Sequence, residues 1–94
     1  MVIKILALMN SLILISKIEE VGADIGEPDC KLINPFVVRS DQTLEPFLYG
    51  YTKQDTFMMS SDKILTLADP TPTLLEKYED LIKEWHNAFT LMFS

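Results

Sequence analysis

The chain has 94 residues, 48% of them apolar, with a formal net charge of −6 and a pI near 4.5. This length fits one domain with a thin core, and the apolar content excludes a disordered tail. The acidity excludes a general electrostatic affinity for nucleic acid or an anionic membrane, so any nucleic-acid site must be local.

The N-terminus predicts two antiparallel strands and a turn. Residues 2–8 are rich in β-forming residues, Asn10 and Ser11 supply a polar turn, and a second strand follows over 12–20. The alternative is a signal peptide, because residues 1–15 have a charged start and an apolar run. That run is interrupted at the turn, is followed by no small-residue cleavage site, and is shorter than the about 20 apolar residues of a membrane-spanning helix. We therefore favour the strands.

The middle of the chain predicts an acidic loop and a third strand. Residues 21–29 contain two glycines, a proline and three acids, which is typical of a flexible loop. A strand is predicted over 30–39, and Pro35 within it indicates an edge, a bend or a bulge because proline has no N–H to donate. Residues 40–45 are polar and turn-like. Residues 46–53 fit either a short strand or an aromatic loop.

The last third predicts a hairpin and then a helix. Residues 56–59 and 64–68 flank a tight turn at 60–63. The helix begins either at Thr71-Pro72, an N-cap with proline in the first turn, or at a capping box from Thr73 to Glu76. Its apolar stripe recurs at steps of three and four residues and contains Leu74, Leu75, Tyr78, Leu81, Ile82, Trp85, Ala88, Phe89 and Met92.

These elements predict one domain over residues 1–94. Its fold class is mainly β with one C-terminal α-helix, with the β part in 1–69 and a linker and helix in 70–94. Thin cores leave apolar surface uncovered, so the high apolar content favours association of the chain with copies of itself.

The sequence contains no constellation for catalysis, a metal or a cofactor. His86 is the one histidine available as a base, and a partly exposed helix residue is the simpler interpretation. One cysteine and one histidine do not make a zinc site, and the acids of residues 19–29 lack the spacing of a calcium loop. The three glycines form no phosphate-binding motif. We therefore predict a protein that is not an enzyme and that uses no cofactor.

Cys30, the single cysteine, cannot form an internal disulfide. This fits a reducing compartment, and we expect the thiol to be a buried small hydrophobe. The predicted location is the cytoplasm, or the host cytoplasm if the protein is viral, and no membrane partner is expected.

Aromatic residues and positive charge mingle in one part of the chain. Phe47, Tyr49 and Tyr51 lie close in sequence to Lys53 and Arg39. Single-stranded nucleic acids use this mixture for base stacking and backbone contact. Aromatic clusters in small β proteins more often close a core or an interface. Both interpretations remain open.

Two stretches of the chain resemble the two halves of a known family motif. Residues 3–11 (IKILALMNS) with 14–18 (LISKI) match an apolar strand, a turn, and a strand with a small residue two before an apolar one. Residues 59–67 (MSSDKILTL) match the second half. The pattern over residues 2–69 resembles the Sm-like (LSm) proteins, above all their divergent phage members. The resemblance implies a short, strongly bent, five-stranded antiparallel barrel that forms rings and binds RNA.

The chain departs from the family pattern at several positions. Serines stand where the family has glycines and an RNA-contacting arginine, and the family's Asp-x-x-x-Asn before the third strand is absent, with Asn34 as a loose substitute. The helix follows the fifth strand, whereas the family usually has it before the first. The nucleic-acid contacts that the resemblance implies are Asn34, Arg39, Ser60, Ser61, Asp62 and Lys63.

The resemblance also implies a partner, which is the chain itself. Its fourth and fifth strands, here 56–59 and 64–68, would pair between neighbours and close a homo-oligomeric ring of roughly five to seven copies. We expect the apolar end of the helix, residues 89–93, to pack on a neighbour. The leading hypothesis is an RNA-binding or single-stranded nucleic-acid-binding ring. The alternative is a structural or assembly adaptor, such as one of a virus, that binds protein and no nucleic acid. The acidity and the methionines suit this alternative.

Overall fold

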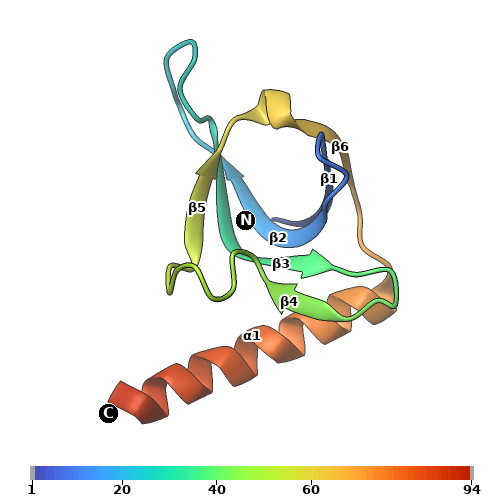
Figure 1. Cartoon of the computed structure of the whole chain (residues 1–94), viewed down its shortest axis with the longest axis vertical. Coiled ribbons are helices and arrows are strands. Elements are labelled where there is room, and N and C mark those ends of the chain that lie inside the picture. The colour runs from blue at the N-terminus through green and yellow to red at the C-terminus, as the bar shows by residue number, and fades with distance from the viewer. Residues whose placement is uncertain (1, 94) are drawn as a thin grey trace.

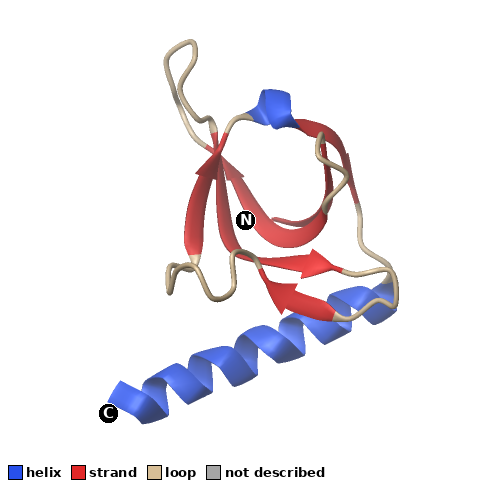
Figure 2. Cartoon of the chain, in the orientation of Figure 1, coloured by secondary structure: helices blue, strands red, loops and turns tan. Residues whose placement is uncertain are grey.

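The computed structural model describes residues 2–93 and gives side-chain detail for residues 2–84. One antiparallel sheet curls around a core, and a long helix lies across the outside of the sheet (Figure 1). Figure 2 shows strands joined by loops, with one short helical turn, before this helix. The elements are β1 (Val2–Leu8), β2 (Ile13–Glu20), β3 (Cys30–Val38), β4 (Leu44–Pro46), β5 (Thr56–Met59), the 3-10 turn η1 (Ser61–Lys63), β6 (Ile64–Ala68) and α1 (Pro72–Phe93).

The strand order confirms a mainly β fold with one C-terminal helix. The strands run β4-β3-β2-β1-β6, and β5 pairs with the first half of β3. Strand β3 is therefore shared, because its second half pairs with β4. The sheet is strongly curved but not closed. Within residues 2–93, β5 and β6 do not pair with each other and are connected through η1.

The sheet has six strands, where the sequence predicted five. The prediction of a turn over residues 40–45 was wrong at its end, because Leu44 and Glu45 already pair with β3. The turn itself is shorter: the N–H of Gln42 donates to the Arg39 carbonyl at 2.8 Å, and Gln42 has a left-handed φ of 65°. After Pro46 the chain makes consecutive turns, so residues 47–53 form a loop.

A bulge lies where β2 and β3 bend. The pairing shifts between Ile15 and Lys17, which leaves two residues, Asn34 and Pro35, opposite Ser16 alone. The bulge confirms the irregularity predicted from Pro35. Asn34 has a left-handed φ of 52°, a conformation that asparagine tolerates better than most residues. We call residues 33–36 of β3, together with Ser16, the bend.

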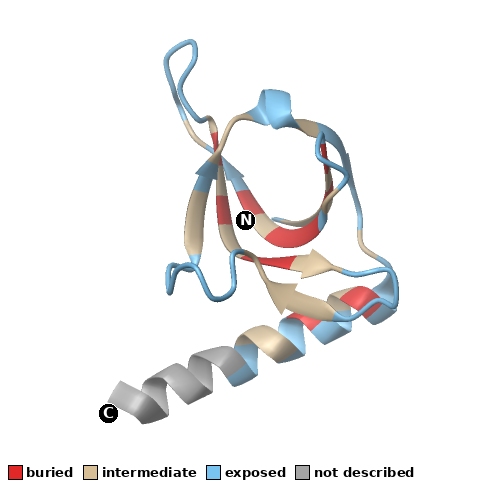
Figure 3. Ribbon diagram, viewed as in Figure 1, coloured by how far each residue is buried: buried red, intermediate tan, exposed pale blue. Residues whose placement is uncertain are grey.

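Two separate apolar clusters are buried, one on each face of the sheet. Figure 3 shows buried segments in the strands and near the start of α1. The inner cluster fills the curl and contains Leu6, Leu8, Leu14, Ile18, Cys30 and Leu32. The outer cluster lies between the sheet and α1 and contains Ile15, Phe36, Leu74 and Tyr78. Neighbouring residues of β2 point to opposite faces, so Leu14 joins the inner cluster and Ile15 the outer one. Cys30 is buried, which confirms the expectation of a buried thiol that packs as a small hydrophobe.

The helix begins at the first of the two predicted positions. The Thr71 hydroxyl accepts the N–H of Leu74 at 3.3 Å, and Pro72 opens the first turn. Tyr78, on the predicted stripe, is fully buried. The stripe from Trp85 onward, and the predicted packing of residues 89–93 on a neighbour, lie outside the part of the chain whose side chains are described.

Candidate functional site

The predicted nucleic-acid turn, residues 60–63, is held by a carboxylate from the acidic loop. Asp29 accepts hydrogen bonds from the backbone N–H and from the hydroxyl of Ser61, both at 2.7 Å. These two bonds lower the pKa of Asp29 below its ordinary value because they favour the ionised carboxylate. The loop of residues 21–29 and the turn therefore meet at one end of the sheet, seen at the top of Figure 1.

This end of the molecule carries mostly negative charge. Asp24, Glu27 and Asp62 are exposed there beside Asp29, and Lys63 is the one cation of η1. A phosphate would meet repulsion from these carboxylates. A ligand at this end would therefore bind through Lys63 and neutral hydrogen bonds, with little help from the overall charge.

Asn34 lies at the bend, near the middle of β3. Its N–H donates to the carbonyl of Asp55 at 2.7 Å, and its own carbonyl accepts the hydroxyl of Tyr78 at 2.8 Å. Its half-buried side chain lines a pocket of about 50 Å³, which is room for a few water molecules.

The pocket gathers part of the predicted aromatic cluster around Asn34. Phe47, Tyr49 and Lys53 line it, and the ring of Phe47 packs edge-on against Phe57 with centroids 5.5 Å apart. Tyr51 is highly exposed and does not line the pocket. The cluster thus has a closing role at Phe47 and a solvent-facing part at Tyr49 and Lys53.

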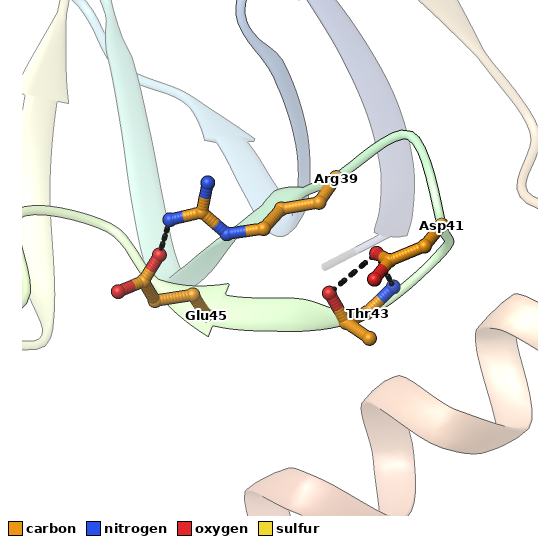
Figure 4. A network of polar contacts seen from close by, with 4 residues as sticks. All are labelled: Arg39, Asp41, Thr43 and Glu45. Atoms are coloured by element: carbon orange, nitrogen blue, oxygen red, sulfur yellow. Dashed lines mark hydrogen bonds and ion pairs between the residues drawn. The ribbon is translucent and has the colours of Figure 1, made fainter.

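Arg39 lies apart from the other predicted contacts. It follows the end of β3, whereas Cys30 at the other end of the strand pairs with Met59, next to the turn at 60–63. Its guanidinium pairs with Glu45, while Asp41 accepts the hydroxyl and N–H of Thr43 in the same hairpin (Figure 4). Asn34 and Arg39 are thus not brought together with residues 60–63.

Three strands of the described sheet, β4, β5 and β6, are open edges, and β4 is the shortest of them with three residues. Every residue of β6 after Ile64 is exposed, and two leucines on one face of the strand, Leu65 and Leu67, are 67% and 49% exposed. On the opposite edge Met58 of β5 is 50% exposed. Among residues 2–93, each of these strands has a strand partner on one side alone.

Two features of the described residues bear on the metal and nucleophile candidates of the sequence. Among residues 2–84, no three metal-ligating side chains lie close enough to hold an ion. Burial, followed by the nearby charges of Asp29 and Glu20, raises the pKa of Cys30 and so disfavours its reactive thiolate. The side chain of His86 lies outside the described residues. Over the range covered by the structure, no helix combines the length and the apolar character needed to cross a membrane.

Two features of the site were missed in the sequence. In the sequence, Asp29 is one of several acids in a loop, and nothing marks it as the partner of Ser61, which is 32 residues away. The hydroxyl of Tyr78 meets a backbone carbonyl 44 residues away. No local pattern carries either contact, since both depend on how the sheet folds back on itself.

The comparisons with known proteins give a family. No curated protein matches the chain. A model of the family of unknown function DUF6561 matches residues 1–83, so the chain belongs to this family.

Proposed function

We propose that this protein is a non-enzymatic, Sm-like subunit that closes into a homo-oligomeric ring and holds single-stranded nucleic acid. The observation that carries the proposal is the pair of open edges. Strands β5 and β6 are the ones that the Sm-like resemblance would pair between copies, and each has a strand partner on one side alone in the described chain. Pairing β5 of one copy with β6 of the next would satisfy both rows of backbone groups.

The exposed side chains support edge pairing. Leu65 and Leu67 present an apolar surface on β6, and Met58 presents one on β5. Exposed apolar side chains beside unpaired backbone groups favour strand addition, which buries both together. Each copy would supply both edges, so the contact is head-to-tail and closes when the rotation per copy divides a full turn.

A crosslinking experiment tests the contact. Met58→Cys together with Leu65→Cys places one thiol on each edge, and a short bismaleimide should link the copies into a ladder that stops at one size on a denaturing gel. Each single variant should give dimers at most, and the wild type, whose Cys30 is buried, should give monomer. A double variant that matches the single variants would refute the pairing of β5 with β6.

Nucleic acid is the ligand that the resemblance implies, and Lys63 supports it as an exposed cation in the turn. The acidic surroundings should make binding weak, and the Lys63 contact should make it fall as the salt concentration rises. Fluorescence anisotropy with short U-rich and A-rich oligonucleotides at low salt tests this. No binding at tens of micromolar protein would reject a nucleic-acid role.

A second candidate is a ring that acts as a protein adaptor. The observation that favours it is the Asp29 carboxylate held against the turn, which places negative charge where phosphate would bind. An adaptor should purify free of nucleic acid. An absorbance spectrum rich in nucleic acid that becomes normal after nuclease treatment would count against the adaptor.

A further inference from the structure

Hydrogen bonds link the bend to α1, to β2 and to the residue before β5. The hydroxyl of Tyr78 in α1 accepts the N–H of Lys17 in β2 at 3.1 Å. It donates to β3, where the carbonyl of Asn34 at 2.8 Å is the nearer acceptor and that of Ile33 lies at 3.2 Å. The N–H of Asn34 in turn donates to the carbonyl of Asp55 at 2.7 Å. Asp55 directly precedes Thr56, the first residue of β5. An uninterrupted path therefore leads from the helix to the edge strand.

The path meets β5 at its start, whereas the rest of the strand has other contacts: Phe57 packs against Phe47, and Met59 packs on the inner cluster. The strand has four residues, and β3 is its one strand partner in the described chain. Its first pair, Thr56 with Ile33, adjoins Asn34. Asn34 has a left-handed φ of 52°, a conformation that costs energy unless neighbouring contacts maintain it. Both of its backbone bonds, to Tyr78 and to Asp55, are contacts of this kind.

We infer that Tyr78 is a positioning residue for β5: docking of α1 through its hydroxyl fixes the backbone of Asn34, and Asn34 fixes the start of the edge strand. The helix therefore controls whether the β5 edge is presented in a form that can pair. The consequence for assembly rests on the ring proposed above, whereas the coupling between Tyr78 and β5 within one chain does not.

The substitution Tyr78→Phe tests the inference with little change in packing. It removes the hydroxyl and keeps the ring, which contacts Phe36 edge-on with centroids 5.8 Å apart. Leu74→Ala is the matched control, because Leu74 lies in the same helix and the same outer cluster but its side chain has no polar atom. Both variants loosen the helix, and Tyr78→Phe alone breaks the path through Asn34.

Amide hydrogen exchange of the full chain is the first measurement. In Tyr78→Phe, the amides of Lys17, Asn34 and β5 should exchange roughly three- to tenfold faster relative to those of β1, the factor expected for each hydrogen bond that the hydroxyl makes, from Lys17 and to Asn34. Leu74→Ala should leave the ratio of β5 to β1 exchange unchanged. The inference is overturned if Asn34 and β5 keep their wild-type ratio in Tyr78→Phe, or if both variants change it equally.

A reciprocal variant keeps the test decisive if Tyr78→Phe does not fold. Thr56→Gly weakens the start of β5, since glycine disfavours a strand. Coupling is reciprocal, so the amide of Lys17, which donates to Tyr78, should then exchange faster relative to β1. Unchanged exchange at Lys17 would overturn the inference.

Assembly is the second measurement and separates the two proposals. The concentration at which copies associate should be roughly three- to tenfold higher for Tyr78→Phe than for Leu74→Ala. The two variants are compared at temperatures at which their thermal stability is equal. A wild type that stays monomeric refutes the proposed ring. The coupling between Tyr78 and β5 is then tested by the hydrogen-exchange comparison. If the wild type assembles and Tyr78→Phe assembles equally well, the inference that α1 controls pairing of the β5 edge is refuted.

Discussion

The carboxylate of Asp29 accepts two hydrogen bonds from Ser61, one from its N–H and one from its hydroxyl, each 2.7 Å long. Asp29 ends the acidic loop, and Ser61 begins the turn between β5 and β6. This contact therefore ties the most acidic segment of the chain to the turn where the sequence predicts nucleic-acid contacts. It links the stability of that end of the sheet to pH.

Stability should depend on the charge of Asp29. Its pKa is lower in the folded state than the ordinary 3.8, chiefly because of the hydrogen bonds from Ser61. A lowered pKa stabilises the fold above pH 3.8, and this contribution is lost as the pH falls through the folded-state pKa. The substitution Asp29→Asn should thus lower the melting temperature at neutral pH and much less in strong acid.

Melting curves across this pH range check the prediction. Asp24→Asn is the control, since Asp24 is an exposed acid of the same loop. Equal losses for Asp29→Asn at neutral and strongly acid pH would show that the Asp29 charge contributes nothing.

The backbone of Asn34 should tolerate glycine better than alanine. Its φ of 52° is left-handed, a region that alanine enters at a cost of roughly 1–2 kcal/mol and glycine enters freely. We expect Asn34→Ala to be less stable than Asn34→Gly by about 1 kcal/mol in urea unfolding. The opposite order would mean that the bend does not hold this conformation in solution.

Lys63 and Arg39 should contribute unequally to nucleic-acid binding. Lys63 is exposed in η1, whereas Arg39 pairs with Glu45 at the far end of β3. Lys63→Ala should weaken oligonucleotide binding. It should also reduce the slope of log affinity against log salt by the amount expected for about one phosphate contact. Arg39→Ala should leave both unchanged. Anisotropy titrations at several salt concentrations measure both quantities, and a larger effect of Arg39→Ala would move the site to the β3–β4 hairpin.

The apolar face of β6 should be needed for association. Leu65→Lys with Leu67→Lys places two charges on an exposed edge strand, which natural sheets use to block strand pairing. We expect this variant to be a folded monomer by sedimentation velocity and circular dichroism. Ile25→Lys, a change of the same kind in the fully exposed loop, should assemble like the wild type. Equal assembly of the two variants would exclude β6 from the interface.

Local patterns were enough to predict much of the fold. Alternation and turn residues gave β1, β2, β5 and β6, and the cap at Thr71 gave the start of the helix. Pro35 indicated the bend in β3. These features depend on residues close together in the chain, so periodicity and turn chemistry report them.

The parts that were missed depend on long-range contacts. Strand β4 has three residues and ends in Pro46, too short for alternation to show, and its pairing with β3 defines it. The position of Arg39 relative to the turn at 60–63 follows from which half of β3 each strand pairs with. Candidate contact residues could be predicted from the sequence, but their positions relative to one another depend on the register of the sheet.

The most direct test of the central claim, that open edges close this chain into a ring, is the solution mass by light scattering over a range of concentrations. The proposal predicts a single species at one fixed multiple of the 10.7 kDa chain, in the range of roughly five to seven copies. A mass of 10.7 kDa at every concentration would contradict it.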